Sequence, residues 1–152
     1  MKIKKNLSLF ISLLTFSLLT FSSSCSERNE TVNCFPNSVI DVSTNLNLQP
    51  YINDLQQKGW CEINEQQCGT RGLILVKNGN NNPYVFDKNA PHICPDENTT
   101  LEVRDNTYIY CPKDGATWIL RDGTPSAIAN IPPKRYYVSF YNSATGQISI
   151  TN

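Results

Sequence analysis

Hydrophobic and polar residues alternate with a period of two in several short stretches of this chain, which is the pattern of strands with one buried face. Val39 to Ser43 is one example, whereas Leu73 to Val76 is continuously apolar and predicts a strand buried on both faces. A short amphipathic helix is predicted between Pro50 and Gly59. Further strands are predicted at 59–63, 84–86, 101–104, 108–110, 117–120, 136–141 and 147–150. Many short strands at close spacing predict an all-β domain, a sandwich or barrel.

The first 24 residues have a different pattern, that of an export signal. Lysines at positions 2, 4 and 5 precede a 15-residue apolar run from Leu7 to Phe21, and three serines follow it. A charged start, an apolar centre and a small-residue cleavage site are typical of a secretory signal peptide. The run is shorter than the ~20 residues that a membrane-spanning helix needs. We therefore expect cleavage before Cys25 and export of the remaining 128 residues, enough for one domain.

The position of Cys25 directly after the predicted cleavage site adds a second expectation. The segment from Ser22 to Cys25 resembles a bacterial lipobox, with Ser22 where Leu is usual. The resemblance implies that Cys25 is acylated, that residues 25–33 form a polar tether, and that the protein is an outer membrane lipoprotein facing the periplasm or the cell surface. Each buried CH₂ contributes ~0.8 kcal/mol, so the lipid membrane is the expected partner. The alternative is ordinary secretion with Cys25 in a disulfide.

Net charge indicates which partners to expect, and the number of cysteines limits how they can pair. After removal of the signal, ten Lys and Arg face thirteen Asp and Glu, a net charge of −3, so no nucleic-acid partner is expected. Disulfides form and persist outside the cytoplasm. Besides Cys25 the chain has five cysteines, so at least one stays free, binds something or pairs between chains.

Two proline-containing loops carry the most specific signal. Ala90-Pro91-His92-Ile93-Cys94-Pro95 and Cys111-Pro112-Lys113-Asp114-Gly115-Ala116 each follow a predicted strand, and a hairpin joins them. The sequence here resembles a Rieske domain, whose loops read Cys-x-His and Cys-x-x-His and hold a [2Fe-2S] cluster. The resemblance implies a Rieske-like fold over residues 34–152, a small β-sandwich with an inserted cluster-binding-type hairpin subdomain at about 85–122. The chain looks especially like exported Rieske-fold lipoproteins of the Bacteroidota.

The ligand set implied by this resemblance is incomplete. The four ligand positions fall on Ala90, His92, Cys111 and Asp114. Alanine has no lone pair to donate, and a carboxylate is a harder, anionic donor than the imidazole that it replaces. We therefore expect no bound cofactor. The alternative is that His92 and Cys111, with Cys94 and Asp114 as substitutes, still bind a [2Fe-2S] cluster.

A covalent bond is expected to take the place of the cluster. Because a disulfide bridges the two loops in some Rieske proteins, the resemblance suggests a Cys94–Cys111 bond, which would stabilise the fold by ~3 kcal/mol in the chain-entropy account. A weaker candidate is a Cys61–Cys68 bond across a turn between two strands. Cys34 is left open as an alternative partner of Cys61 or Cys68.

A single metal ion is the less favoured alternative for the two loops. Zinc accepts mixed nitrogen, sulfur and oxygen ligands, here His92, Cys94, Cys111 and Asp114. The His-x-Cys spacing is cramped for two ligands of one tetrahedral ion. Asp114 precedes a glycine and is more simply explained as a turn residue.

No enzyme is predicted. The sequence offers no phosphate loop, paired-carboxylate site or Ser-His-Asp order, and His92 is its one histidine. We therefore expect a membrane-anchored exported lipoprotein with a structural or interaction role. The alternative is a Rieske-type [2Fe-2S] electron-transfer protein.

Overall fold

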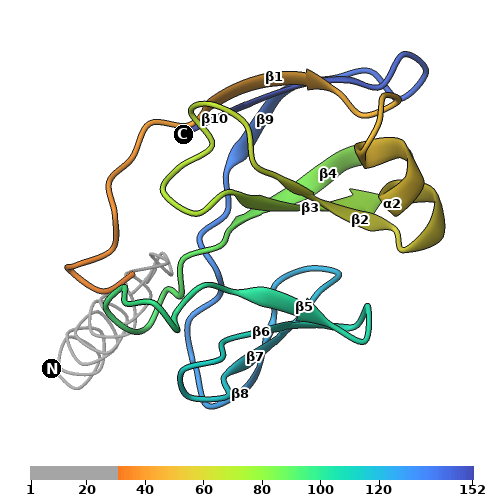
Figure 1. Cartoon of the computed structure of the whole chain (residues 1–152). Helices are drawn as coiled ribbons and strands as arrows, with labels where there is room; N and C mark the ends of the chain where they lie inside the picture. Colours follow the sequence, from red (N-terminus) through yellow and green to blue (C-terminus); the bar gives the residue numbers. More distant parts are fainter. Residues whose placement is uncertain (1–30) are drawn as a thin grey trace, which may run out of the picture.

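The computed structural model describes residues 31–152, and these contain three antiparallel sheets and one short helix (Figure 1). The elements are β1 (Asp41–Asn45), α2 (Tyr51–Gln57), β2 (Trp60–Ile63), β3 (Leu73–Asn78), β4 (Asn81–Asp87), β5 (Glu102–Arg104), β6 (Tyr108–Tyr110), β7 (Thr117–Ile119), β8 (Pro125–Ala127), β9 (Tyr137–Tyr141) and β10 (Gln147–Thr151). The predicted all-β character is thereby confirmed. The predicted signal peptide, the acylation site Cys25 and the tether up to residue 30 lie outside the described residues.

The three sheets have the strand orders β1-β10-β9, β2-β3-β4 and β5-β6-β7-β8, and the second lies between the other two (Figure 1). Leu73 and Leu75 of β3 pack into one hydrophobic core with residues of β1, β9 and β10. Ile74 and Val76 point to the opposite face, into a second core with residues of β6 and β7. The apolar run of β3 is therefore buried on both faces, as its sequence predicts.

The β5-β6-β7-β8 sheet is an insertion between β4 and β9. The two strands that flank it are held together, because the Tyr136 amide donates to the Val85 carbonyl at 2.9 Å and the Asp87 amide donates to the Lys134 carbonyl at 2.8 Å. Gly123 allows close contact between the insertion and the body. A Cβ there would lie 2.8 Å from a ring carbon of Phe86, and its φ of +77° also favours glycine.

The strand β8 was not predicted from the sequence. It has three residues, begins with a proline and pairs only with β7. Its sequence therefore lacks the alternation of apolar and polar residues by which the other strands were predicted. The helix α2 and the other strands lie within a few residues of the predicted ranges.

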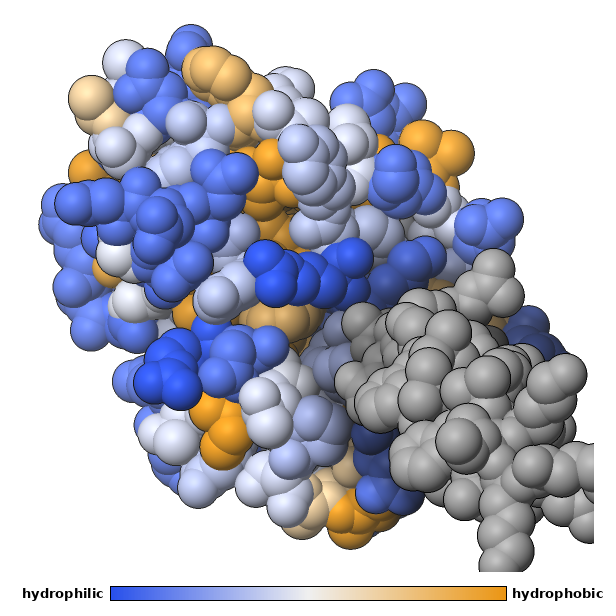
Figure 2. All heavy atoms as spheres, turned by 180° about the vertical axis from the view of Figure 1, so that it is seen from behind, coloured by the Kyte–Doolittle hydropathy of each residue, from blue (hydrophilic) through white to orange (hydrophobic). Residues whose placement is uncertain are grey.

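One face of the molecule is mainly polar. The face seen in Figure 2 is covered by hydrophilic side chains, with hydrophobic ones in small separate patches. Within residues 31–152, no helix is long and apolar enough to cross a membrane.

Candidate functional site

The two loops singled out in the sequence lie next to each other at one end of the molecule. Loop 1 (residues 88–101) connects β4 to β5, and loop 2 (residues 111–116) connects β6 to β7. Lys113 of loop 2 forms an ion pair with Asp96 of loop 1, with Nζ and Oδ2 2.7 Å apart. The hairpin therefore brings both loops together, as expected from their spacing.

His92 and Asp114 form the central contact between the loops. Nε2 of His92 lies 2.6 Å from Oδ2 of Asp114, and the two side chains are 14% and 27% exposed. The edge of the His92 ring also packs on Trp118, with the ring centroids 5.4 Å apart. The positions that the resemblance assigns to the two histidine ligands are thus bonded to each other.

Asp114 has several partners besides His92. Its Oδ1 accepts a hydrogen bond from the Ala116 amide at 3.0 Å, so the predicted turn role is confirmed. Burial alone would raise the pKa of Asp114. Hydrogen bonds from the Ala116 amide, the His92 ring and the Cys111 thiol outweigh this effect, and the pKa is lowered. Asp114 is therefore an anion that accepts bonds from both loops.

The two positions assigned to cysteine ligands lie in the apolar core under the loops. Ala90 and Cys111 are both buried and belong to the same hydrophobic cluster as Trp118. Burial raises the pKa of the Cys111 thiol, and the Asp114 carboxylate adds to this, although hydrogen bonds from the backbone of loop 2 oppose it. Cys111 is accordingly a protonated core residue at neutral pH.

A buried polar network at the base of loop 1 was not predicted from the sequence. Asp87, at the end of β4, is 1% exposed. Its carboxylate accepts hydrogen bonds from the Tyr136 hydroxyl at 2.5 Å and from the Asn89 amide at 2.6 Å. The signal was present, since Asp87 and Val85 share the inward face of a period-two strand. This network fixes the start of loop 1 to the body of the domain.

Arg71 supports the second half of loop 1. Its guanidinium donates to the hydroxyls of Thr99 and Thr100 at 3.0 and 2.6 Å and to the carbonyl of Asp96 at 2.5 Å. An arginine is suited to this role, since its planar fork carries five donors. No sequence pattern had indicated it, because Arg71 lies about 25 residues before its partners in an irregular segment.

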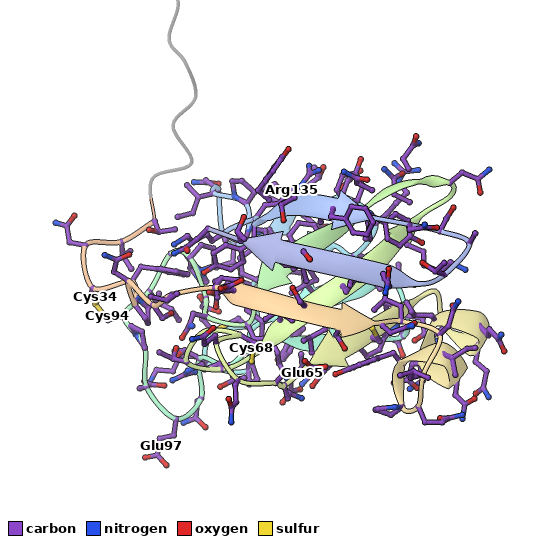
Figure 3. All side chains as sticks on the ribbon, turned by 90° about the horizontal axis from the view of Figure 1, so that it is seen from above. Cys34, Glu65, Cys68, Cys94, Glu97 and Arg135 are labelled. Atoms are coloured by element: carbon purple, nitrogen blue, oxygen red, sulfur yellow. A yellow bond between two sulfur atoms is a disulfide. The ribbon has the colours of Figure 1, made fainter. Side chains whose placement is uncertain are left out.

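The disulfide differs from the predicted one. Cys94 is bonded to Cys34, with the sulfur atoms 2.01 Å apart, and Cys111 is unpaired among the described residues. The predicted Cys94–Cys111 bond is therefore wrong. Cys94 is exposed on loop 1, whereas Cys111 is buried in the core. Figure 3 shows Cys34 and Cys94 at the edge of the molecule where the described chain begins.

The Cys61–Cys68 bond is also absent. Cys61 lies opposite Leu75 in the β2-β3 ladder, and Cys68 forms a β-bridge with Ile40 beyond the turn, so the hairpin does not place the two cysteines across from each other. Both are free and buried, and the possible partner Cys34 is taken by Cys94. Burial, followed by the nearby carboxylates of Asp54 and Glu62, raises the pKa of Cys61 to about 12.

The donor set does not fit a four-ligand [2Fe-2S] cluster. Ala90 offers no donor, the sulfur of Cys94 is in a disulfide, and Oδ2 of Asp114 is bonded to His92. The same disulfide removes Cys94 from the four residues considered as ligands of a single zinc ion, since a cysteine binds a metal ion as a thiolate. Among residues 31–152, no group of three or more His, Cys, Asp or Glu side chains is placed to hold a metal ion.

Comparisons of the chain with protein-family models, curated proteins and solved structures found no match. The resemblance of the two loops to Rieske ligand loops therefore stays a prediction.

Proposed function

We propose that this protein is a membrane-anchored exported lipoprotein whose Rieske-like domain serves a structural or interaction role without a [2Fe-2S] cluster. Two loops that a cluster would otherwise join are joined by side chains. The cores on both faces of the β2-β3-β4 sheet provide a rigid body under these loops.

The hydrogen bond between the His92 and Asp114 side chains is the observation that carries this proposal. It directly links the two positions at which the family resemblance places histidine ligands, at 2.6 Å. An ion pair between Lys113 and Asp96 links the same two loops. An exposed ion pair such as Lys113–Asp96 contributes only about 0–1 kcal/mol, so the buried core that the two loops share provides most of the free energy that holds them together.

One observation favours the alternative, a [2Fe-2S] electron carrier. Nδ1 of His92 is buried and has no hydrogen-bond partner among the described residues, so one nitrogen of a predicted ligand remains available. Cys111 is also free. Two donors are half of the set that a Rieske cluster uses, which is why the structural role is preferred.

Anaerobic purification of the chain from Ser26 onward, followed by iron and sulfide analysis, distinguishes the two functions. The proposal requires a colourless protein with no stoichiometric iron. A coloured protein with two irons and inorganic sulfide per chain, and a Rieske-type electron paramagnetic resonance signal after reduction, would establish the alternative. Exclusion of air matters because oxygen destroys weak clusters and would produce the expected result for the wrong reason.

Lipid attachment is tested separately in cells that express the full chain. Incorporation of labelled palmitate and recovery in the membrane fraction are expected, and both should be lost in a Cys25→Ser variant. A wild-type chain that remains unlabelled and is found in the soluble fraction would refute the membrane anchor and support ordinary secretion.

A further inference from the structure

The segment that follows the predicted tether is fastened to loop 1. The Cys34–Cys94 disulfide connects them, and two residues earlier the Val32 amide donates to the Pro91 carbonyl at 3.0 Å. The ring of Phe35 also lies 5.2 Å from Nζ of Lys134. The described chain therefore begins on the end of the domain that carries the two loops (Figures 1 and 3).

The length of chain before this attachment is short. Val32 is the seventh residue after Cys25. A chain extends by at most ~3.3–3.6 Å per residue, so Val32 stays within about 25 Å of Cys25. A domain of this length has a radius of gyration of about 14 Å and is roughly 35 Å across. The attachment is therefore shorter than the domain is wide.

The disulfide determines where the tether ends. Without it, the bond from Val32 to Pro91 would be the one backbone hydrogen bond left between residues 31–37 and loop 1. The next position bonded to the body of the domain is Ser38, whose carbonyl accepts a hydrogen bond from the Asn152 side chain at 3.0 Å. Ser38 is the thirteenth residue after Cys25, so the reach would increase to about 45 Å, more than the width of the domain. Both Cys34 and Cys94 are exposed, so this bond is accessible to reductants from solvent.

An exposed apolar residue lies on the same end. Ile128 is 64% exposed, and a Cβ on Gly115 of loop 2 would lie 3.7 Å from its Cδ1. The backbone of Ile128 has a φ of +70°, an unfavourable conformation for a β-branched residue. We call loop 1, loop 2 and Ile128 together the loop end.

We propose that the loop end is the surface that faces the lipid membrane, and that the Cys34–Cys94 disulfide maintains this orientation. The inference rests on the proposed lipid anchor at Cys25. Its partner is the headgroup layer of the membrane in which that anchor is inserted. In this orientation the side of the domain opposite the loop end faces away from the membrane.

Phe140 provides a matched reference position on that opposite side. In the β1-β10-β9 sheet, β9 runs parallel to β1. Tyr137, at the start of β9, lies level with the first residue of β1, because both pair with the same residue of β10. Phe140 lies near the opposite end of β9. Phe140 is 50% exposed, similar to Ile128. A tryptophan at either position is therefore accessible to solvent in the free domain.

The test uses the full acylated chain in phosphatidylcholine vesicles that contain a dansyl-labelled headgroup lipid. Energy transfer is measured for Ile128→Trp and for Phe140→Trp, after subtraction of the unsubstituted protein, which contributes Trp60 and Trp118. We expect transfer to be several-fold more efficient from position 128 than from position 140. In the Cys34→Ser/Cys94→Ser background the two efficiencies should become similar.

The outcomes separate this proposal from the anchor itself. Sedimentation with vesicles is measured first, and a chain that stays in the supernatant refutes the lipid anchor together with the orientation that depends on it. A chain that sediments but gives equal transfer from both positions, or more from position 140, overturns the orientation alone. A difference that survives loss of both cysteines overturns the role of the disulfide.

Discussion

Removal of the Cys34–Cys94 disulfide should reduce the free energy of unfolding by a calculable amount. The bond closes a segment with a sequence separation of 60. In the chain-entropy account, a closed loop of that size restricts the unfolded chain by about 4 kcal/mol at 25 °C. In the folded state of the Cys34→Ser/Cys94→Ser variant, residues 33–37 also regain conformational freedom, because few other bonds hold this segment. This gain offsets part of the loss. We therefore expect a loss of about 2–4 kcal/mol.

Equilibrium unfolding of the chain from Ser26 in urea measures this loss. The midpoint should fall in the variant, and a reductant should lower the wild-type midpoint to the same value while leaving the variant unchanged. Cys61→Ala/Cys68→Ala is unsuitable as a control because both residues are in the core. Cys25 is absent from this chain, so the reductant acts on one bond. A change below about 0.5 kcal/mol would refute the chain-entropy reasoning.

Three further predictions concern the buried and paired groups. Tyr136→Phe should lower the free energy of unfolding by about 1.5–3 kcal/mol, since the buried Asp87 carboxylate loses a hydrogen bond; a loss below this range in urea unfolding would contradict it. The pKa of Asp114 is lowered in the folded state, so its stabilising contribution is present above its unfolded pKa and is lost as the pH falls through the folded value. Asp114→Ala should therefore destabilise the protein more at pH 6 than at pH 2, and an equal loss at both values would show that the hydrogen bonds to this carboxylate do not stabilise the fold. Cys61, Cys68 and Cys111 should resist iodoacetamide at pH 8 in the native state and react after unfolding, because burial raises the pKa of each thiol; mass spectrometry of the native protein would reveal any exception.

The strand pattern could be predicted from the sequence because each layer buries a periodic set of side chains. Leu73 to Val76 shows this most clearly, since a run that is apolar on both faces must be covered on both. β8 escaped prediction because an edge strand of three residues needs no periodicity.

The candidate site was predicted in part. The facing loops follow from the spacing of two similar loops around a hairpin. The direct contact of His92 with Asp114 was not predicted, because the sequence pattern indicated ligand positions and a turn but not a bond between these side chains. The disulfide was missed because it depends on the path of the segment before β1, which has no periodic pattern and returns to loop 1. Arg71 was missed because its partners are 25 or more residues away, and a local pattern carries no information about such pairs. Asp87 lies on the inward face of its strand, but its partner Tyr136 is 49 residues away and could not be found from the local pattern.

Burial of three thiols that are unpaired among residues 31–152 has a consequence for how the protein would mature in the oxidising compartment that we propose for it. During synthesis Cys34 emerges after Cys25, and both Cys61 and Cys68 become available to it before Cys94 does. Any bond formed early is therefore a non-native one, and only burial of Cys61 and Cys68 in the completed core withdraws them from exchange. Correct oxidation must follow collapse of the sheets, so a thiol–disulfide isomerase should increase the yield of native protein more than an oxidant alone.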